Sequence, residues 1–186
     1  QINIQSSGGS IYGLDPEVAW NYGVSWLQGF NLFERKGNIT FDFYRTHFQN
    51  QVVVDWENPQ EISFYNLQGE SYANSFQVEV NHPIIEKVNV RLAYKYYDIQ
   101  TDYNSGRFTK PLTPNHRFFA NLSYETEKKL GKQWKFDTTY NLIGEQRLPD
   151  TSANPVQYRL EEYSKGYSLL NFQITRVFSK KIEIYV

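Results

Sequence analysis

The chain has 186 residues, a length that fits one domain or part of one. Its formal net charge is −1, so no excess of cations marks it for nucleic acid or for an anionic membrane surface. Cysteine is absent, which excludes disulfides, thiolate metal sites and cysteine nucleophiles. Aromatic side chains make up 17% of the residues, so the fold must give many rings an apolar environment.

Hydropathy excludes a membrane-spanning helix but not a membrane-spanning sheet. No segment approaches the ~18 consecutive apolar residues that such a helix needs. A barrel strand presents only every second side chain to lipid, so it reads as polar on average. The mean hydropathy of −0.63 is therefore compatible with a membrane β-barrel.

Hydrophobicity along the chain has a dominant period of two, which is typical of β-strands with one apolar face. The positions between the apolar ones are mostly Asn, Gln, Thr and Ser, and no segment has the pattern of an amphipathic helix. In chain order, eight runs carry these apolar positions: Trp20, Tyr22, Val24 and Trp26; Ile39, Phe41 and Phe43; Tyr72, Phe76, Val78 and Val80; Val88, Val90, Leu92, Tyr94 and Tyr96; Phe118, Ala120, Leu122 and Tyr124; Trp134, Phe136, Tyr140 and Leu142; Leu170, Phe172 and Ile174; Ile182, Ile184 and Val186.

The connections between these runs alternate in length. Such a rhythm predicts an antiparallel up-and-down sheet of about eight strands, with short turns at one end and long loops at the other. Outer-membrane barrels have short periplasmic turns and long external loops, so we expect the long loops here to be external. The predicted short turns are Asn31–Gly37, Asn81–Lys87, Glu127–Gln133 and Ser179–Lys181, and the long loops are Gln49–Gln68, Asp98–Asn115 and Gly144–Gly166.

Alternation also occurs in half-buried sheets of soluble proteins, so it leaves two classes open. Three features favour lipid: runs of about ten residues rather than five or six, rings near the ends of the runs, and weakly charged polar positions. The alternative is a soluble lipocalin-like β-barrel that binds one small ligand inside, with its apolar face turned inward. The three long loops fit that alternative poorly.

Four stretches resemble TonB-dependent outer-membrane receptors. Leu14–Glu17 followed by Ala19–Gly23 is similar to an "L-x-P-E-x-x-W-N-Y-G" entry into a barrel strand, and Asp42–Val52 is similar to a "DFYRTDFQNQVV" stretch. Pro114–Asn121 and Gly144–Pro149 follow at matching intervals. Each stretch alone is a weak signal, but their order and spacing extend over essentially the whole chain.

The resemblance implies a barrel of about 22 strands closed by an N-terminal plug. Such receptors take up scarce nutrients (iron chelates, cobalamin or glycans) with energy delivered by TonB from the inner membrane. The chain shows no plug, no TonB-contacting segment and no final strand ending in an aromatic residue. We therefore expect residues 1–186 to be a partial C-terminal region of the barrel in a bacterial outer membrane. Its expected partners are outer-membrane lipid, the plug and remaining strands of the full-length chain, and TonB through the missing N-terminal part.

The sequence predicts no catalytic, cofactor-binding or metal-binding residues, and we do not expect an enzyme. His47, His82 and His116 lie far apart and have no second ligand at metal-like spacing, so they are expected at the surface or at strand ends. Glu161 and Glu162 are adjacent, and neighbours in an extended chain point to opposite sides, so they do not form a catalytic dyad. No G-x-S-x-G elbow is present.

The long loops also contain aromatic and cationic side chains: Trp56, Tyr65, Tyr103 and Arg107. At a barrel mouth these residues could face a ligand, or they could pack between loops. The sequence does not decide between the two roles, so the ligand-binding residues and the nutrient stay unassigned. Because a partial barrel would lack most of the walls of a shared pocket, we expect the isolated segment to bind no nutrient usefully.

Overall fold

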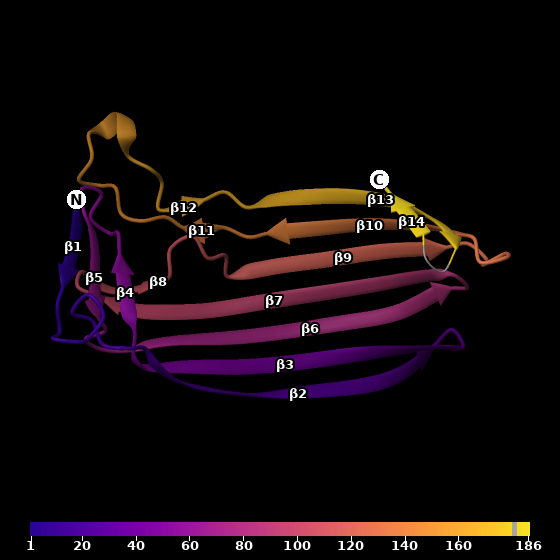
Figure 1. Cartoon of the computed structure of the whole chain (residues 1–186), viewed down its shortest axis with the longest axis horizontal. Helices are drawn as coiled ribbons and strands as arrows, with labels where there is room; N and C mark the ends of the chain where they lie inside the picture. Colours follow the sequence, from indigo (N-terminus) through magenta and orange to yellow (C-terminus); the bar gives the residue numbers. More distant parts are fainter. Residues whose placement is uncertain (180–181) are drawn as a thin grey trace.

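A computed structural model describes residues 1–179 and 182–186 as one long antiparallel sheet with a layer of smaller strands at one end (Figure 1). Eight strands of the sheet follow one another in chain order, each paired with the next, and the short strand β8 pairs with β7 at its end. The predicted all-β, up-and-down arrangement is therefore confirmed. The eight strands are β2 (Val18–Leu32), β3 (Arg35–Asn50), β6 (Ser71–Ile85), β7 (Val88–Tyr103), β9 (His116–Glu125), β10 (Gln133–Ile143), β13 (Tyr167–Ser179) and β14 (Ile182–Tyr185).

Cross-strand register puts the predicted apolar positions on one face. Residues directly opposite each other in an antiparallel pair project to the same side of the sheet. Val24 of β2 lies opposite Phe43 of β3, which lies opposite Phe76 of β6 and, one strand further, Tyr96 of β7. The alternate residues form a second face of mainly hydroxyl, amide and charged groups. We call these the apolar face and the polar face.

Neither face of the sheet is covered by a second layer of the described residues. On the apolar face, Trp20 is 64% exposed, Val24 63% and Leu170 71%. The buried hydrophobic side chains that form the core of the described chain are few, and most of them lie in the loop layer rather than on the apolar face: Val53, Tyr65, Tyr103 and Val177. The apolar face is thus a large uncovered hydrophobic surface, which in water would drive association.

The short turns are tight and lie together at one end of the sheet (Figure 1). Phe33 and Glu34 join β2 to β3 with φ angles of 50° and 60°. Positive φ at both central residues is the type I′ geometry, whose twist matches that of the flanking strands. Leu130 and Gly131, with φ of 52° and 79°, repeat this geometry between β9 and β10. The predicted turn at Ser179–Lys181 falls largely on residues 180–181, outside the described residues.

Two turns, Asn31–Gly37 and Asn81–Lys87, and the loop Asp98–Asn115 are shorter than predicted because the strands extend further, whereas the connection Gly144–Gly166 lies between its strands as predicted. β2 and β3 continue until only two residues separate them, and β7 runs to Tyr103, inside the expected loop Asp98–Asn115. The expected loops also contain strands of their own: β4 (Val52–Asp55), β5 (Ile62–Asn66), β8 (Gly106–Thr109), β11 (Gln146–Arg147) and β12 (Tyr163–Ser164), besides a 3₁₀ turn at Val156–Tyr158. The long connections are therefore present as predicted, and they contain short strands that the sequence did not predict.

Within the described residues the sheet does not close on itself. β2 pairs only with β3 and β14 only with β13, so these strands form its two edges. A closed eight-stranded barrel around a ligand, the arrangement of the soluble alternative, is not formed. None of the described helical segments has the length and apolarity to cross a membrane.

Candidate ligand-binding loops

The long connections gather at the end of the sheet opposite the tight turns (Figure 1). There β1 (Ile2–Gln5) pairs in parallel with β5, and β5 pairs antiparallel with β4, giving a small three-stranded sheet. β8 folds back on the end of β7, and β11 pairs with β12. These segments together form what we call the loop layer. Its backbone hydrogen bonds make it an ordered structure rather than a set of solvated loops.

A small hydrophobic core holds the loop layer to the end of β7. Val53, Tyr65 and Tyr103 are buried against one another, and Leu67 packs beside them. The Tyr65 hydroxyl donates to Asp55 Oδ2 at 2.7 Å and accepts from the backbone N–H of Asn104 at 2.9 Å. Burial and the hydrogen bond to the Asp55 carboxylate raise the pKa of Tyr65 well above its usual range. The phenol is therefore a neutral structural donor.

Arg147 of β11 joins three long connections through one side chain. Its guanidinium donates to both Glu57 oxygens, from Nη1 to Oε2 at 2.9 Å and from Nη2 to Oε1 at 2.5 Å. Its Nε donates to the carbonyl of Thr109 at 2.7 Å, and its Cζ lies 5.1 Å from the centre of the Phe108 ring. The Arg147 and Glu57 side chains are only 8% and 7% exposed. Burial lowers the pKa of Arg147, but Glu57 more than offsets this and the net pKa is raised.

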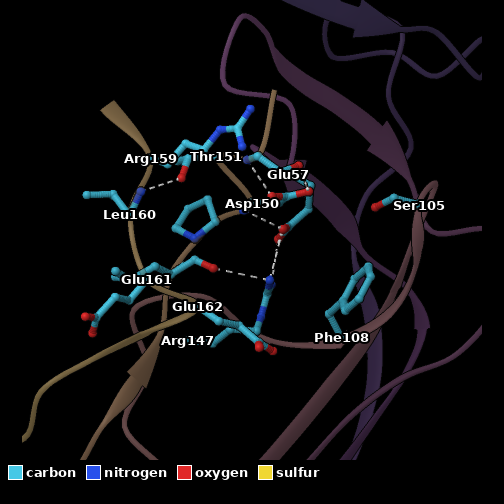
Figure 2. Close-up of a pocket in the computed structure, with 13 residues that line it drawn as sticks. Glu57, Ser105, Phe108, Arg147, Asp150, Thr151, Arg159, Leu160, Glu161 and Glu162 are labelled. Atoms are coloured by element: carbon cyan, nitrogen blue, oxygen red, sulfur yellow. Dashed lines mark hydrogen bonds and ion pairs between the residues drawn. The ribbon is translucent and has the colours of Figure 1, made fainter. Parts of the chain in front are cut away.

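A pocket of about 540 Å³ opens beside this ion pair (Figure 2). Phe108 and Ser105 lie on one side of it, the residues from Asp150 to Glu162 lie on the other, and Glu57 contacts the second side by accepting a hydrogen bond from the backbone N–H of Asp150 at 3.1 Å. Four carboxylates line the pocket against two guanidinium groups: Glu57, Asp150, Glu161 and Glu162 against Arg147 and Arg159. Because Glu57 and Arg147 neutralise each other, the remaining charge of the pocket is predominantly negative.

The loop residues named from the sequence are mostly structural. Tyr65 and Tyr103 are buried in the core of the loop layer, although Tyr103 also borders the groove beside Trp56. Arg107 is committed to an ion pair, with Nε 2.6 Å from Asp102 Oδ1 and Nη2 2.9 Å from Glu70 Oε2. Trp56 is 37% exposed and lines a separate groove of about 270 Å³. Of these four residues, Trp56 is therefore the one with an exposed, unpaired side chain at a groove.

The three histidines lie on different strands of the sheet and do not converge. His47 is on β3, His82 on β6 and His116 at the start of β9, where Nδ1 is 2.7 Å from the Tyr94 hydroxyl. Within residues 1–179 and 182–186, no group of three His, Asp or Glu side chains could hold a metal ion. Glu161 and Glu162 lie side by side on the pocket wall, where they add negative charge.

Sequence reasoning missed the residues that build the pocket. Glu57 and Arg147 are 90 positions apart and lie in segments without periodicity, so no local pattern links them. The one available signal was the resemblance itself, since Arg147 falls within the Gly144–Pro149 stretch. Phe108 and Asp150 gave no signal at all.

Comparison with known families agrees with this architecture. The family model described as TonB dependent receptor-like, beta-barrel matches residues 2–186. None of the curated proteins compared with the chain matches it.

Proposed function

Because the chain belongs to the TonB dependent receptor-like β-barrel family, we propose that it forms a C-terminal part of the barrel of a bacterial outer-membrane receptor. The receptor takes up a scarce nutrient, such as an iron chelate, cobalamin or a glycan, with energy supplied through TonB. Members of this family are transporters rather than enzymes. The plug, the other strands and the TonB-contacting segment belong to the full-length chain.

One observation carries the proposal: a long sheet with an apolar face that none of the described residues covers. The exposed rings and aliphatic groups of that face, among them Trp20, Trp26 and Phe172, would be unstable in water. Lipid is the solvent that such a face requires, and the alternate positions then line a polar barrel interior. The tight turns at one end and the loop layer at the other fit periplasmic and external sides respectively.

The loop-layer pocket is the part of this chain that we propose contacts the nutrient first. It lies at the external end, and Phe108, Arg159 and the two adjacent glutamates offer stacking and hydrogen-bonding groups. Its unneutralised carboxylates favour ligands that present hydroxyl or ammonium groups over anions. Other external loops of the parent barrel would complete the site.

The test is uptake by cells that carry or lack the gene for the full-length receptor. Cells limited for one nutrient class at a time receive a labelled iron chelate, cobalamin or oligosaccharide. Deletion should abolish energy-dependent uptake of one class, and the gene supplied on a plasmid should restore it. Collapsing the inner-membrane proton gradient should stop uptake but leave surface binding intact. Equal uptake of every class by both strains would contradict the proposal.

A further inference from the structure

Two cations stand side by side on the polar face without a counter-charge. Lys95 of β7 is the register partner of Arg117 of β9, so the two side chains project to the same side from neighbouring strands. Neither forms an ion pair with any carboxylate in residues 1–179 and 182–186. Lys95 Nζ instead lies 4.9 Å from the centre of the Tyr97 ring. Like charges directly opposite each other destabilise a sheet.

The groups around these cations are also hydrogen-bond donors without partners. A cavity of about 220 Å³ is lined by Lys95, Arg117, Gln77 and Asn141 together with apolar residues of β7, β9 and β10. Gln77 is the cross-strand neighbour of Lys95 on β6, and Asn141 lies on β10. Neither amide has a hydrogen-bond partner within the described part of the chain. Four donor-bearing side chains thus converge on one small space.

Two other cations on the polar face have a carboxylate partner, which Lys95 and Arg117 lack. Arg91, which precedes Lys95 on the same face of β7, forms an ion pair with Glu79 of the neighbouring strand β6, with Nη2 2.8 Å from Oε2. Lys135 lies 3.9 Å from Glu183. Among the cross-strand partners of Lys95, the nearest carboxylate is that of Asp42, which is separated from Lys95 by the intervening strand that carries Gln77. Asp42 already accepts a hydrogen bond from Ser25. The Lys95–Arg117 pair is therefore an anion site with no anion supplied by this part of the chain.

We propose that Lys95, Arg117, Gln77 and Asn141 form a carboxylate-binding site on the inner wall of the barrel. A carboxylate fits the cavity volume and accepts charge-assisted hydrogen bonds from both cations and from the two amides. The carboxylate belongs to the segment that fills the barrel interior, because the acidic loop pocket would repel an anionic nutrient before it arrived. This inference rests on the proposed function, from which it takes that the polar face lines a filled barrel interior and that the acidic pocket lies at the external end.

The site is tested on the full-length receptor, purified in detergent and in buffer free of carboxylates. A water-soluble carbodiimide joins a lysine amine to a carboxylate in direct contact, with loss of water. Peptide mass spectrometry should find Lys95 linked to an Asp or Glu of the interior segment. Arg117→Gln should weaken that link, because the variant removes half of the charge that holds the carboxylate. If Lys95 is not linked to any carboxyl side chain, the proposal that a carboxylate of the protein occupies the site is wrong.

Thermal unfolding separates the possible sources. Lys95→Gln should lower the midpoint temperature by a few degrees if a carboxylate is resident, while Lys128→Gln on an exposed turn should not change it. An unchanged or raised midpoint for Lys95→Gln would overturn the site, since removing one of two unpaired like charges relieves repulsion. A wild-type midpoint that rises with added citrate, and does so less in Lys95→Gln, would support the site but assign the carboxylate to solution. These readouts do not depend on nutrient uptake, so they separate failure of the site from failure of the proposed function.

Discussion

Glu57→Gln should loosen the loop layer without unfolding the sheet. The substitution keeps the size and one acceptor of the side chain but leaves the buried Arg147 guanidinium without its counter-charge. Removing one partner of a buried ion pair costs about 3–5 kcal/mol. We expect the lower end, about 3 kcal/mol, because the pair borders an open pocket and Arg147 keeps its bond to Thr109.

That cost should appear as faster local opening. Since 1.4 kcal/mol is a factor of ten, about 3 kcal/mol corresponds to roughly 100-fold faster amide exchange if the loop layer opens as a unit. The assay is hydrogen–deuterium exchange of the full-length receptor in detergent, followed by mass spectrometry. Peptides covering β4, β5 and β11 should exchange faster, whereas those from the middle of β6 should not.

The matched control is Glu127→Gln in an ion pair at the other end of the sheet. Glu127 Oε1 lies 3.0 Å from Lys87 Nζ, but the Glu127 side chain is 61% exposed, so exchange near it should not change measurably. Adding Arg147→Gln to Glu57→Gln should cost less than the sum of the two single changes, because the second removes the orphaned charge. Less than threefold faster exchange in Glu57→Gln would refute the assignment of Arg147 as the side chain that fastens the loops.

Three further outcomes are expected in the full-length receptor. Leu92→Arg should destabilise the receptor in lipid vesicles by about 2–4 kcal/mol and Ala93→Arg by little, measured by urea unfolding, and equal costs would contradict the assignment of faces. A peptide tag inserted at Asn104–Ser105 should bind antibody on intact cells, whereas a tag at Lys128–Lys129 should not, and the reverse labelling would refute the orientation. Burial and a neighbouring carboxylate raise the pKa of Tyr65, so its stabilisation of the loop layer is complete below pH 10 and is lost as the pH rises above that value. Exchange of the loop layer should accelerate above pH 10 in the wild type and less in Tyr65→Phe; equal acceleration would argue against a role for this phenol.

Sequence alone predicted the faces of the sheet because successive side chains of a strand project to opposite sides. Along β7, every second residue from Val88 to Tyr96 is apolar, and the register places all of them on one face. Beyond Tyr96 the strand continues to Tyr103, but there Thr101 and Tyr103 are buried and the residue between them is half-buried. The alternation therefore changes phase after Tyr96, with Asp98, Gln100 and Asp102 at the positions that are apolar earlier in the strand. The outer half of the strand was therefore read as loop.

The loop layer could not be predicted because its contacts are long-range and individually specific. Tyr65 meets Asp55 at a separation of only 10 residues, yet nothing in the sequence distinguishes this tyrosine from the exposed ones. Arg147 meets Glu57 across 90 residues. Such pairs depend on where the strands place the ends of the loops, so they become visible only after the sheet has fixed its register. Residue types alone left packing and ligand binding as equal alternatives.

The two edges of the sheet lead to a prediction for residues 1–186 by themselves. β2 and β14 each pair on one side only, so alternate backbone N–H and C=O groups of β2 point outward without partners. In hydrocarbon each unsatisfied group costs several kcal/mol, and open sheet edges are not tolerated there. In detergent the isolated segment should therefore associate edge to edge, and light scattering after size-exclusion chromatography should show oligomers.

The same open edges should leave the isolated segment without useful affinity for a nutrient. Its loop-layer pocket is intact but open on the side where other loops and the interior segment would complete the walls, and recognition requires groups that converge on a preformed concavity. Calorimetry with iron chelates, cobalamin and oligosaccharides should detect no micromolar binding, whereas the full-length receptor should bind one of them. The opposite result would be a monomeric segment that binds a nutrient at micromolar concentration and whose β2 amides exchange slowly. It would show that the sheet closes on itself and forms its own binding site. That result would favour the soluble ligand-binding alternative, because only closure would satisfy β2 without a partner chain.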